Sequence, residues 1–190
     1  RSGAAEAGNG SVLNAAGATW NSTLASGTNF IYATNQGVGD TGAGATFNNA
    51  GTFNKQGAGS TNVWTSFLNN GSLNVQAGQL QFTNGGALTH NGVVTVAAGA
   101  VLDFNSTNAV THTINTASTT LAGTLSITNG NFLNFTAPHT IGGAGTFQQT
   151  FGQITGANLT LGPSLNVVIT DGGHSGAATT TVQGATTISG

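Results

Sequence analysis

A short pattern that recurs at a nearly constant interval constrains this sequence more than any other feature. Within residues 67–104 the segment NGSLNVQAG at 70–78 recurs as NGVVTVAAG at 91–99, and each copy continues to a Leu-x-Phe sequence. Inside each copy, apolar residues alternate with polar ones, which is the period of a strand with one buried face. Glycines and Asn-Gly pairs separate these strands and indicate turns.

Such a period predicts a coil that stacks on copies of itself, because one coil of short strands cannot bury its inner face alone. Each strand would pair with the equivalent strand about 4.8 Å above and below it. We therefore expect an all-β fold, a parallel β-helix (β-solenoid) of about nine coils of about 21 residues. The general rule for parallel crossover connections makes it right-handed.

The alternation also predicts which side chains line the tube and which lie at its corners. The expected inner ladder is Phe47, Phe53, Phe67, Leu73, Val75, Leu80, Phe82, Val94, Val96, Leu102, Phe104, Leu125, Ile127 and Phe147, and the expected corner residues are Asn49, Gly51, Asn70, Gly71, Asn91 and Gly92. At these corners Asn49, Asn70 and Asn91 would stack, with their amides hydrogen-bonded along the axis.

The chain is expected to form one domain. Residues 1–46 would be irregular first coils or a cap, 47–104 the most regular repeats, 105–122 a longer excursion and 123–190 looser coils. Glycines before the strands mark the coils, at positions 51, 71, 92, 123 and 145, and the longer interval between Gly92 and Gly123 suggests the excursion. Trp20, Phe30 and Tyr32 are expected to plug the end of the tube, with a ligand platform as the alternative.

Composition narrows the class further. Only 3% of the residues are charged, against about 25% in ordinary domains. Glycine, asparagine and threonine dominate at the expense of glutamate, lysine and arginine, which argues against an α-rich protein. The near absence of lysine and arginine makes nucleic acid an unexpected partner, and no apolar run is long enough to insert in a membrane. The chain lacks cysteine, and its ends are typical of a segment of a longer polypeptide.

Candidate catalytic or ligand-binding patterns are weak. Residues 37–42, GVGDTG, match G-x-G-x-x-G, but no helix follows to receive a pyrophosphate. Asp40 and Asp103 are separated by nearly three repeats, which is too far for a glycosidase pair, and Asp171 lies further on. We therefore predict no catalytic residues and no enzymatic activity.

The histidines and threonines give no stronger site. His90 and His112 are separated by about one repeat and could stack in adjacent coils, but no third ligand is evident, so no metal and no cofactor are predicted. Threonine runs such as 116–120 raise the possibility of an ice-binding face, yet their positions change from coil to coil. Threonine favours strands in any case.

The repeated N-x-G-x-Φ-x-Φ-x-x-G-x-Φ-x-F modules of residues 47–104, where Φ is apolar, resemble the β-solenoid segments of large bacterial surface and secreted proteins. These are autotransporter passengers and filamentous-haemagglutinin-like adhesins. The resemblance implies a right-handed parallel β-helix, a place outside the cell or on the surface of a Gram-negative bacterium, and a role in adhesion, biofilm or surface structure. No binding residue is carried over, because a shared architecture does not specify a site.

Three functions follow as hypotheses. The first is a non-enzymatic extracellular rod, structural or adhesive, whose partner is a second copy stacked on its end coils or a surface or glycan ligand. Low charge removes the repulsion that keeps strand edges apart. The second is a carbohydrate-binding or carbohydrate-active β-helix, and the third is an ice-binding β-solenoid.

Overall fold

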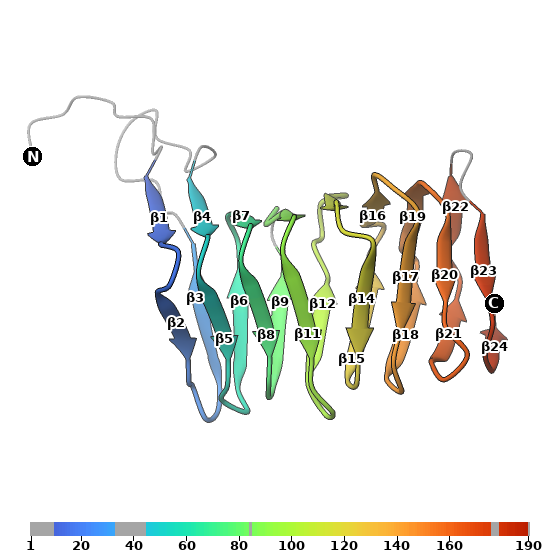
Figure 1. Ribbon diagram of the computed structural model, residues 1–190, viewed down its shortest axis with the longest axis horizontal. Coiled ribbons are helices and arrows are strands. Elements are labelled where there is room, and N and C mark those ends of the chain that lie inside the picture. The colour runs from blue at the N-terminus through green and yellow to red at the C-terminus, as the bar shows by residue number, and fades with distance from the viewer. Residues whose placement is uncertain (1–9, 33–44, 84, 176–178, 190) are drawn as a thin grey trace, which may run out of the picture.

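The computed structural model describes residues 10–32, 45–83, 85–175 and 179–189. Over these ranges the chain forms strands, turns and bends and no helix, so none is present that could cross a membrane. The strands follow one another around a tube, and each turn of the chain lies beside the one before it (Figure 1). The G-x-G-x-x-G match at 37–42, with Asp40, lies outside the described residues.

Three parallel sheets of eight strands each form the walls of the tube. The first sheet contains β1 (Ser11–Asn14), β4 (Thr46–Asn49), β7 (Ser66–Asn69), β10 (Leu88–His90), β13 (Thr111–Ile114), β16 (Phe132–Phe135), β19 (Gln153–Gly156) and β22 (Gly173–Ser175). The second contains β2 (Thr19–Ser22), β5 (Thr52–Lys55), β8 (Ser72–Val75), β11 (Val93–Val96), β14 (Ser118–Leu121), β17 (His139–Gly142), β20 (Leu159–Leu161) and β23 (Thr180–Val182). The third contains β3 (Thr28–Ile31), β6 (Ser60–Val63), β9 (Gln79–Phe82), β12 (Val101–Phe104), β15 (Thr124–Thr128), β18 (Thr146–Thr150), β21 (Asn166–Thr170) and β24 (Thr186–Ser189).

The parallel β-solenoid expected from the repeat is confirmed, but the tube has fewer turns than expected. Each sheet contains eight described strands, so the described chain makes eight coils with about seven turns from the first to the last, slightly fewer than the nine coils expected. The first turn is long, because Ser11 pairs with Thr46, whereas Thr46 pairs already with Ser66. Dividing the chain length by the repeat length therefore overestimates the number of coils.

The alternating apolar side chains lie inside the tube. Every residue of the expected inner ladder has 6% or less of its surface exposed. Leu73 sits in register between Phe53 and Val94, and the ring of Phe47 stacks on that of Phe67 at 4.8 Å between centroids. Because like side chains meet from coil to coil, each strand buries its inner face against two neighbours.

The corners need glycine because the backbone of the neighbouring coil leaves no room for a side chain. A Cβ atom on Gly71 would overlap the carbonyl oxygen of Gly51, and one on Gly92 would overlap that of Gly71. None of the three has a positive φ. The turn-forming freedom that the sequence suggested is therefore not what these corners use; they need the absence of a side chain, because adjacent turns lie in direct backbone contact.

The long interval from Gly92 to Gly123 arises from a change of corner. A Cβ atom on Gly123 would meet the carbonyl oxygens of Ala97 and Ala100, so Gly123 stacks below the β11–β12 turn and not below Gly92. Residues 105–122, interpreted as an excursion, contain β13 and β14, which pair in register with strands of both neighbouring coils. The segment between β12 and β13 is the longest part of this range that lies outside the strands.

The expected stack of Asn49, Asn70 and Asn91 must be corrected by one position. Asn49 pairs with Asn69 and points inward, fully buried, whereas Asn70 and Asn91 are on the outside. A shift of one position moves a strand side chain to the opposite face. The corners therefore carry two amide ladders, an inner one that contains Asn49 and an outer one that contains Asn70 and Asn91.

Candidate functional site

The described surface is almost free of charge. Among the described residues, Asp171 is the only exposed lysine, arginine, aspartate or glutamate, because Lys55 and Asp103 are both buried. Asp103 lies in β12 and Asp171 follows β21, three coils away along the third sheet. At about 4.8 Å per coil, this separation of roughly 14 Å is too large for a pair of catalytic carboxylates.

Asp103 organises a polar strip on the outer face of the third sheet. Its Oδ2 atom accepts hydrogen bonds from Gln79 Nε2 and Gln81 Nε2, each at 3.0 Å. Burial raises the pKa of the carboxyl group, while hydrogen bonds from Ser126, Gln81, Asn105 and Gln79 oppose that rise. The other carboxylate oxygen, Oδ1, is buried and has no hydrogen-bond partner. The strip is thus held in place by hydrogen bonds between adjacent coils.

The inner amide ladder continues into a histidine. Asn14 Nδ2 donates to Asn49 Oδ1 at 2.7 Å, and Asn49 Nδ2 donates to Asn69 Oδ1 at 2.6 Å. Asn69 Nδ2 then donates to His90 Nδ1 at 2.9 Å. Asn14 and Asn49 also donate to the backbone carbonyls of Thr52 and Ser72, which begin the second-sheet strand of the neighbouring coil, so the ladder braces the inside of this corner.

His90 is therefore a neutral imidazole whose Nε2 carries the proton, since its Nδ1 accepts a hydrogen bond. That Nε2 has no hydrogen-bond partner. Burial, and secondarily the positive charge that His139 would carry, lower the pKa of His90 to about 4. Both histidines line a cavity of about 10 Å³ inside the tube, with Thr119 as its third polar residue. This volume is enough for about one water molecule.

His112 and His139 are also inside the tube. Leu88 N donates to His112 Nδ1 at 3.2 Å, and the ring of His112 lies 4.3 Å from that of Phe104. Burial lowers the pKa of His112 to about 4. His139 Nδ1 donates to the carbonyl of Thr116 at 2.6 Å, and burial lowers its pKa as well.

These contacts do not create a metal centre. His90 Nδ1 and His112 Nδ1 are both already occupied as acceptors, from different donors, and the described residues contain no group of three possible metal ligands. The interior histidines instead fill core positions with neutral rings. Their chemical consequence is a dependence of stability on pH.

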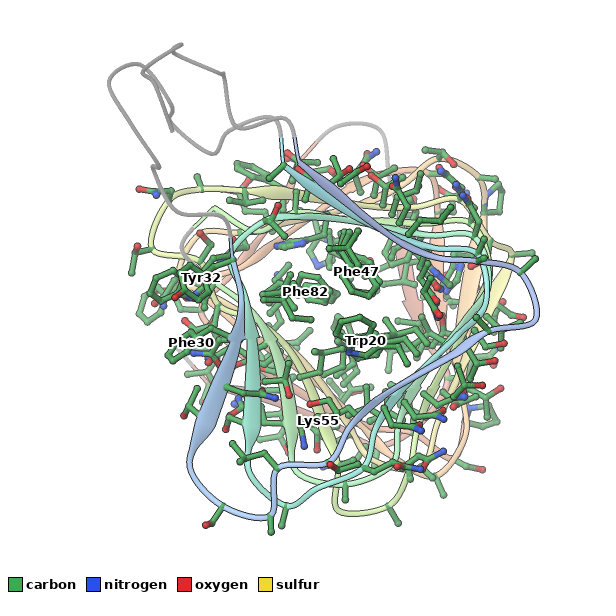
Figure 2. The ribbon with its side chains drawn as sticks, turned by 90° about the vertical axis from the view of Figure 1, so that its left-hand side faces the viewer. Trp20, Phe30, Tyr32, Phe47, Lys55 and Phe82 are labelled. Carbon is green, nitrogen blue, oxygen red and sulfur yellow. The ribbon has the colours of Figure 1, made fainter. Side chains whose placement is uncertain are left out.

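Lys55 is the least expected interior residue. Its side chain is fully buried between Ser22 and Val75 of the neighbouring coils, and Figure 2 shows it on the inner side of the wall. Its ammonium group donates to the carbonyl of Gly57 and, at 3.0 Å, to that of Ala77. Burial lowers its pKa. Two backbone carbonyls thus take the place of an acidic partner.

Trypsin is expected to leave the native tube intact at Lys55, the only lysine of the chain. Proteases need an extended and accessible segment, whereas Lys55 is buried in a strand that pairs on both sides. Digestion would be followed by mass spectrometry, with the urea-unfolded chain as the control that is cut after Lys55. Rapid cleavage of the folded chain at this bond would contradict the buried placement.

The aromatic residues near the N-terminal end fall into two groups. Trp20 lies inside the ring of strands, edge-on against Phe47 at 5.2 Å between centroids, and covers the end of the tube (Figure 2). Phe30 and Tyr32 lie outside the wall and meet Trp64 there. The expected plug is therefore formed by Trp20, while Phe30 and Tyr32 belong to an outer aromatic cluster.

Outside the tube, uncharged side chains form ladders from coil to coil. Asn91 Nδ2 donates to Asn70 Oδ1 at 2.7 Å, and Asn115 Nδ2 donates to Asn91 Oδ1 at 2.5 Å. Threonines align over only part of the length, for example Thr128, Thr150 and Thr170 on the third sheet. The surface is thus a mixed array of amides and hydroxyls rather than a continuous threonine face.

The chain matches no family model, no curated protein and no solved structure. The resemblance to bacterial surface β-solenoids consequently rests on the repeat pattern and on the architecture that the pattern predicted.

Proposed function

We propose that this chain is a non-enzymatic, extracellular structural or adhesive rod that assembles end to end, at the surface of a Gram-negative bacterium. The observation that carries this proposal is that the same inner columns of side chains run from the first described coil to the last, and that the strands of these two coils pair on one side only among the described residues. Trp20 begins the column that passes through Phe53 and ends at Val182. Ile31 begins the column that ends at Ile188, whose surface is 74% exposed.

A second copy placed on the end of the first would continue these columns. Its Trp20 would pack on Val182 and its Ile31 on Ile188, while its β1, β2 and β3 would pair with β22, β23 and β24. In the described chain each of these six strands pairs on one side only. Open parallel edges with little charge favour such addition.

We expect Ile188→Asp to abolish filaments that the unaltered chain forms. The substitution places a charge in the column that the next copy would cover, and an unpaired buried charge is strongly unfavourable. Negative-stain electron microscopy and sedimentation over a concentration series would give the length of the particles. Thr187→Asp is the matched control. Thr187 and Ile188 are adjacent and both exposed, but Thr187 pairs with Val168 and points outward, away from the column that the next copy would cover.

Filaments one tube wide that lengthen with concentration, persist in Thr187→Asp and disappear in Ile188→Asp would support assembly. Short rods of one length at every concentration would overturn end-to-end assembly. The rod would then act as a spacer or as an adhesive segment.

A second function, carbohydrate binding, is favoured by one observation. The outer aromatic cluster exposes three aromatic rings on a surface that otherwise carries amides and hydroxyls.

A further inference from the structure

Three aromatic rings form a compact cluster on the outer face of the third sheet. Phe30, Tyr32 and Trp64 come from the first two described coils, and their ring centroids are separated by 5.0 Å for Phe30 and Trp64, 5.9 Å for Tyr32 and Trp64, and 6.2 Å for Phe30 and Tyr32. Tyr32 has 54% of its surface exposed and Trp64 has 39%. The cluster therefore keeps its geometry through mutual edge contacts while a large apolar area faces solvent.

The cluster rests on a rigid base. Phe30 lies opposite Asn62 in the pairing of β3 with β6, and the Trp64 backbone N–H donates to the carbonyl of Ile31 at 2.9 Å. Val63, next to Trp64, is fully buried and points into the tube. The core is thus complete without the cluster, so packing inside the tube does not explain why three aromatic residues lie outside it.

A polar strip continues from the cluster along the rod axis. Phe30, Asn62, Gln81 and Asp103 occupy successive coils of one outward column. Gln81 and Gln79 are held by the Asp103 carboxylate at 3.0 Å each. The Oδ1 atoms of Asn62 and Asp103 have no hydrogen-bond partner, but both are buried and out of reach of a ligand. The accessible polar groups of this strip are therefore the half-buried amides of Gln79 and Gln81.

We propose that the outer aromatic cluster and this strip form a binding site for a neutral polysaccharide chain. A pyranose ring has an apolar C–H face that packs on an aromatic ring, and hydroxyl groups at its rim that form hydrogen bonds with side-chain amides such as those of Gln79 and Gln81. The absence of exposed lysine and arginine from the described surface disfavours an anionic polymer or a phosphate. A glycan that lies along the axis would meet one coil about every 4.8 Å, which is close to the length of one sugar residue.

In this site Tyr32 and Trp64 supply the stacking faces and Gln79 and Gln81 supply the hydrogen bonds. Asp103 is a positioning residue, because its carboxylate is nearly covered and holds the two glutamine side chains. The site does not depend on end-to-end assembly, so each proposal can fail without the other.

Isothermal titration calorimetry with cellohexaose, chitohexaose and laminarihexaose would test the site, with polygalacturonate as an anionic probe. We expect at least one neutral oligosaccharide to bind, and Trp64→Ala or Tyr32→Ala to weaken that binding about tenfold or more, as expected for the loss of one stacked aromatic ring. Phe151→Ala is the matched control, since Phe151 is an exposed aromatic residue far along the tube. The Phe151→Ala variant should bind the same oligosaccharide with an affinity within about twofold of that of the unaltered chain.

A melting curve for each variant separates loss of the site from loss of the fold, because the cluster lies outside the core. Failure of all three neutral oligosaccharides to bind would overturn the proposal, as would equal binding by Trp64→Ala and Phe151→Ala. Binding of polygalacturonate alone would overturn the assignment to a neutral glycan. Lateral association of rods that disappears in Trp64→Ala, without any glycan binding, would identify the cluster as a contact between copies instead.

Discussion

Val94→Asp is expected to destabilise the tube by at least about 3 kcal/mol, the cost of leaving an unpaired charge in a core. Val94 is 6% exposed and lies in register with Leu73, inside the tube. His90 and His139 line the same cavity as Val94 but are neutral at neutral pH, because burial lowers the pKa of both, and Lys55 occupies the coil two turns earlier. At neutral pH no cation of the described interior therefore pairs with the carboxylate. For a chain of this length the melting temperature would fall by roughly 10 °C.

Val93→Asp is the matched control for this substitution. Val93 is the adjacent residue of the same strand and has the same side chain, but it points outward and is 56% exposed. Its replacement should change the free energy of unfolding by no more than about 0.5 kcal/mol. Thermal melts followed by far-ultraviolet circular dichroism would measure both variants. Equal melting temperatures for the two aspartate variants would refute the inward assignment of Val94 and the register of β11.

The inner face of the tube was predictable because one physical rule sets it. Apolar residues at every second position, such as Leu73 and Val75, must share a face, and the repeat tells which strands stack. The rule is insensitive to the length of the connections, however. The architecture was therefore predicted correctly and the number of coils slightly overestimated, since the long step from β1 to β4 has no separate signal in the alternation.

At the corners, the expected stack of asparagines was shifted by one position at its first member. Asn69 and Asn70 are adjacent and identical, but the glycines that mark the coils, Gly51 and Gly71, align Asn49 with Asn69 and not with Asn70. The two choices place the asparagine on opposite faces. Space in the stack decides, because Gly51 and Gly71 must come into register where no side chain fits between them. That requirement puts Asn49 inside the tube, in contact with Asn69.

The candidate glycan site was only partly visible in the sequence. Phe30 and Tyr32 stand out as aromatic residues near the first coil, but a strand of uncertain register does not show which side of the wall they occupy. Trp64 gives no signal of its own, because it follows the last inward residue of its strand and so falls outside the alternating pattern. The cluster forms only when the first two coils pair, through contacts between residues that are distant in the sequence.

The buried histidines show a similar limit. Sequence spacing suggested that His90 and His112 meet, whereas in the fold His90 interacts electrostatically with His139 and shares a cavity with it. His90 occupies the position that asparagine holds in the preceding coils, so it extends an existing ladder with a ring that can titrate. No inward carboxylate is present among the described residues to stabilise its charged form. Burial therefore dominates its pKa.

Acidification from pH 6.5 to about pH 4 is expected to destabilise the tube steeply. The pKa values of His90 and His112 are about 4 in the folded chain, against 6.5 for an unburied histidine. Between these values the unfolded chain binds protons that the folded chain does not, so stability falls as the pH falls through this window. Above pH 6.5 each neutral histidine makes its full contribution to the free energy of unfolding. By pH 4 about 3 kcal/mol of that contribution is lost for each of the two histidines.

The variant His90→Asn would show how much of this pH dependence comes from the protonation of His90. Asparagine continues the amide ladder of Asn49 and Asn69 and cannot be protonated, so the variant should remain folded at neutral pH and lose stability less steeply on acidification. Urea unfolding at several pH values would give the slope of the free energy against pH. His174→Asn is the control, because His174 is exposed at the last coil and its replacement should leave most of the slope intact. A stability that stays constant between about pH 7 and pH 4 in the unaltered chain would show that the interior histidines accept protons without cost, and hence that the tube opens to water at these positions.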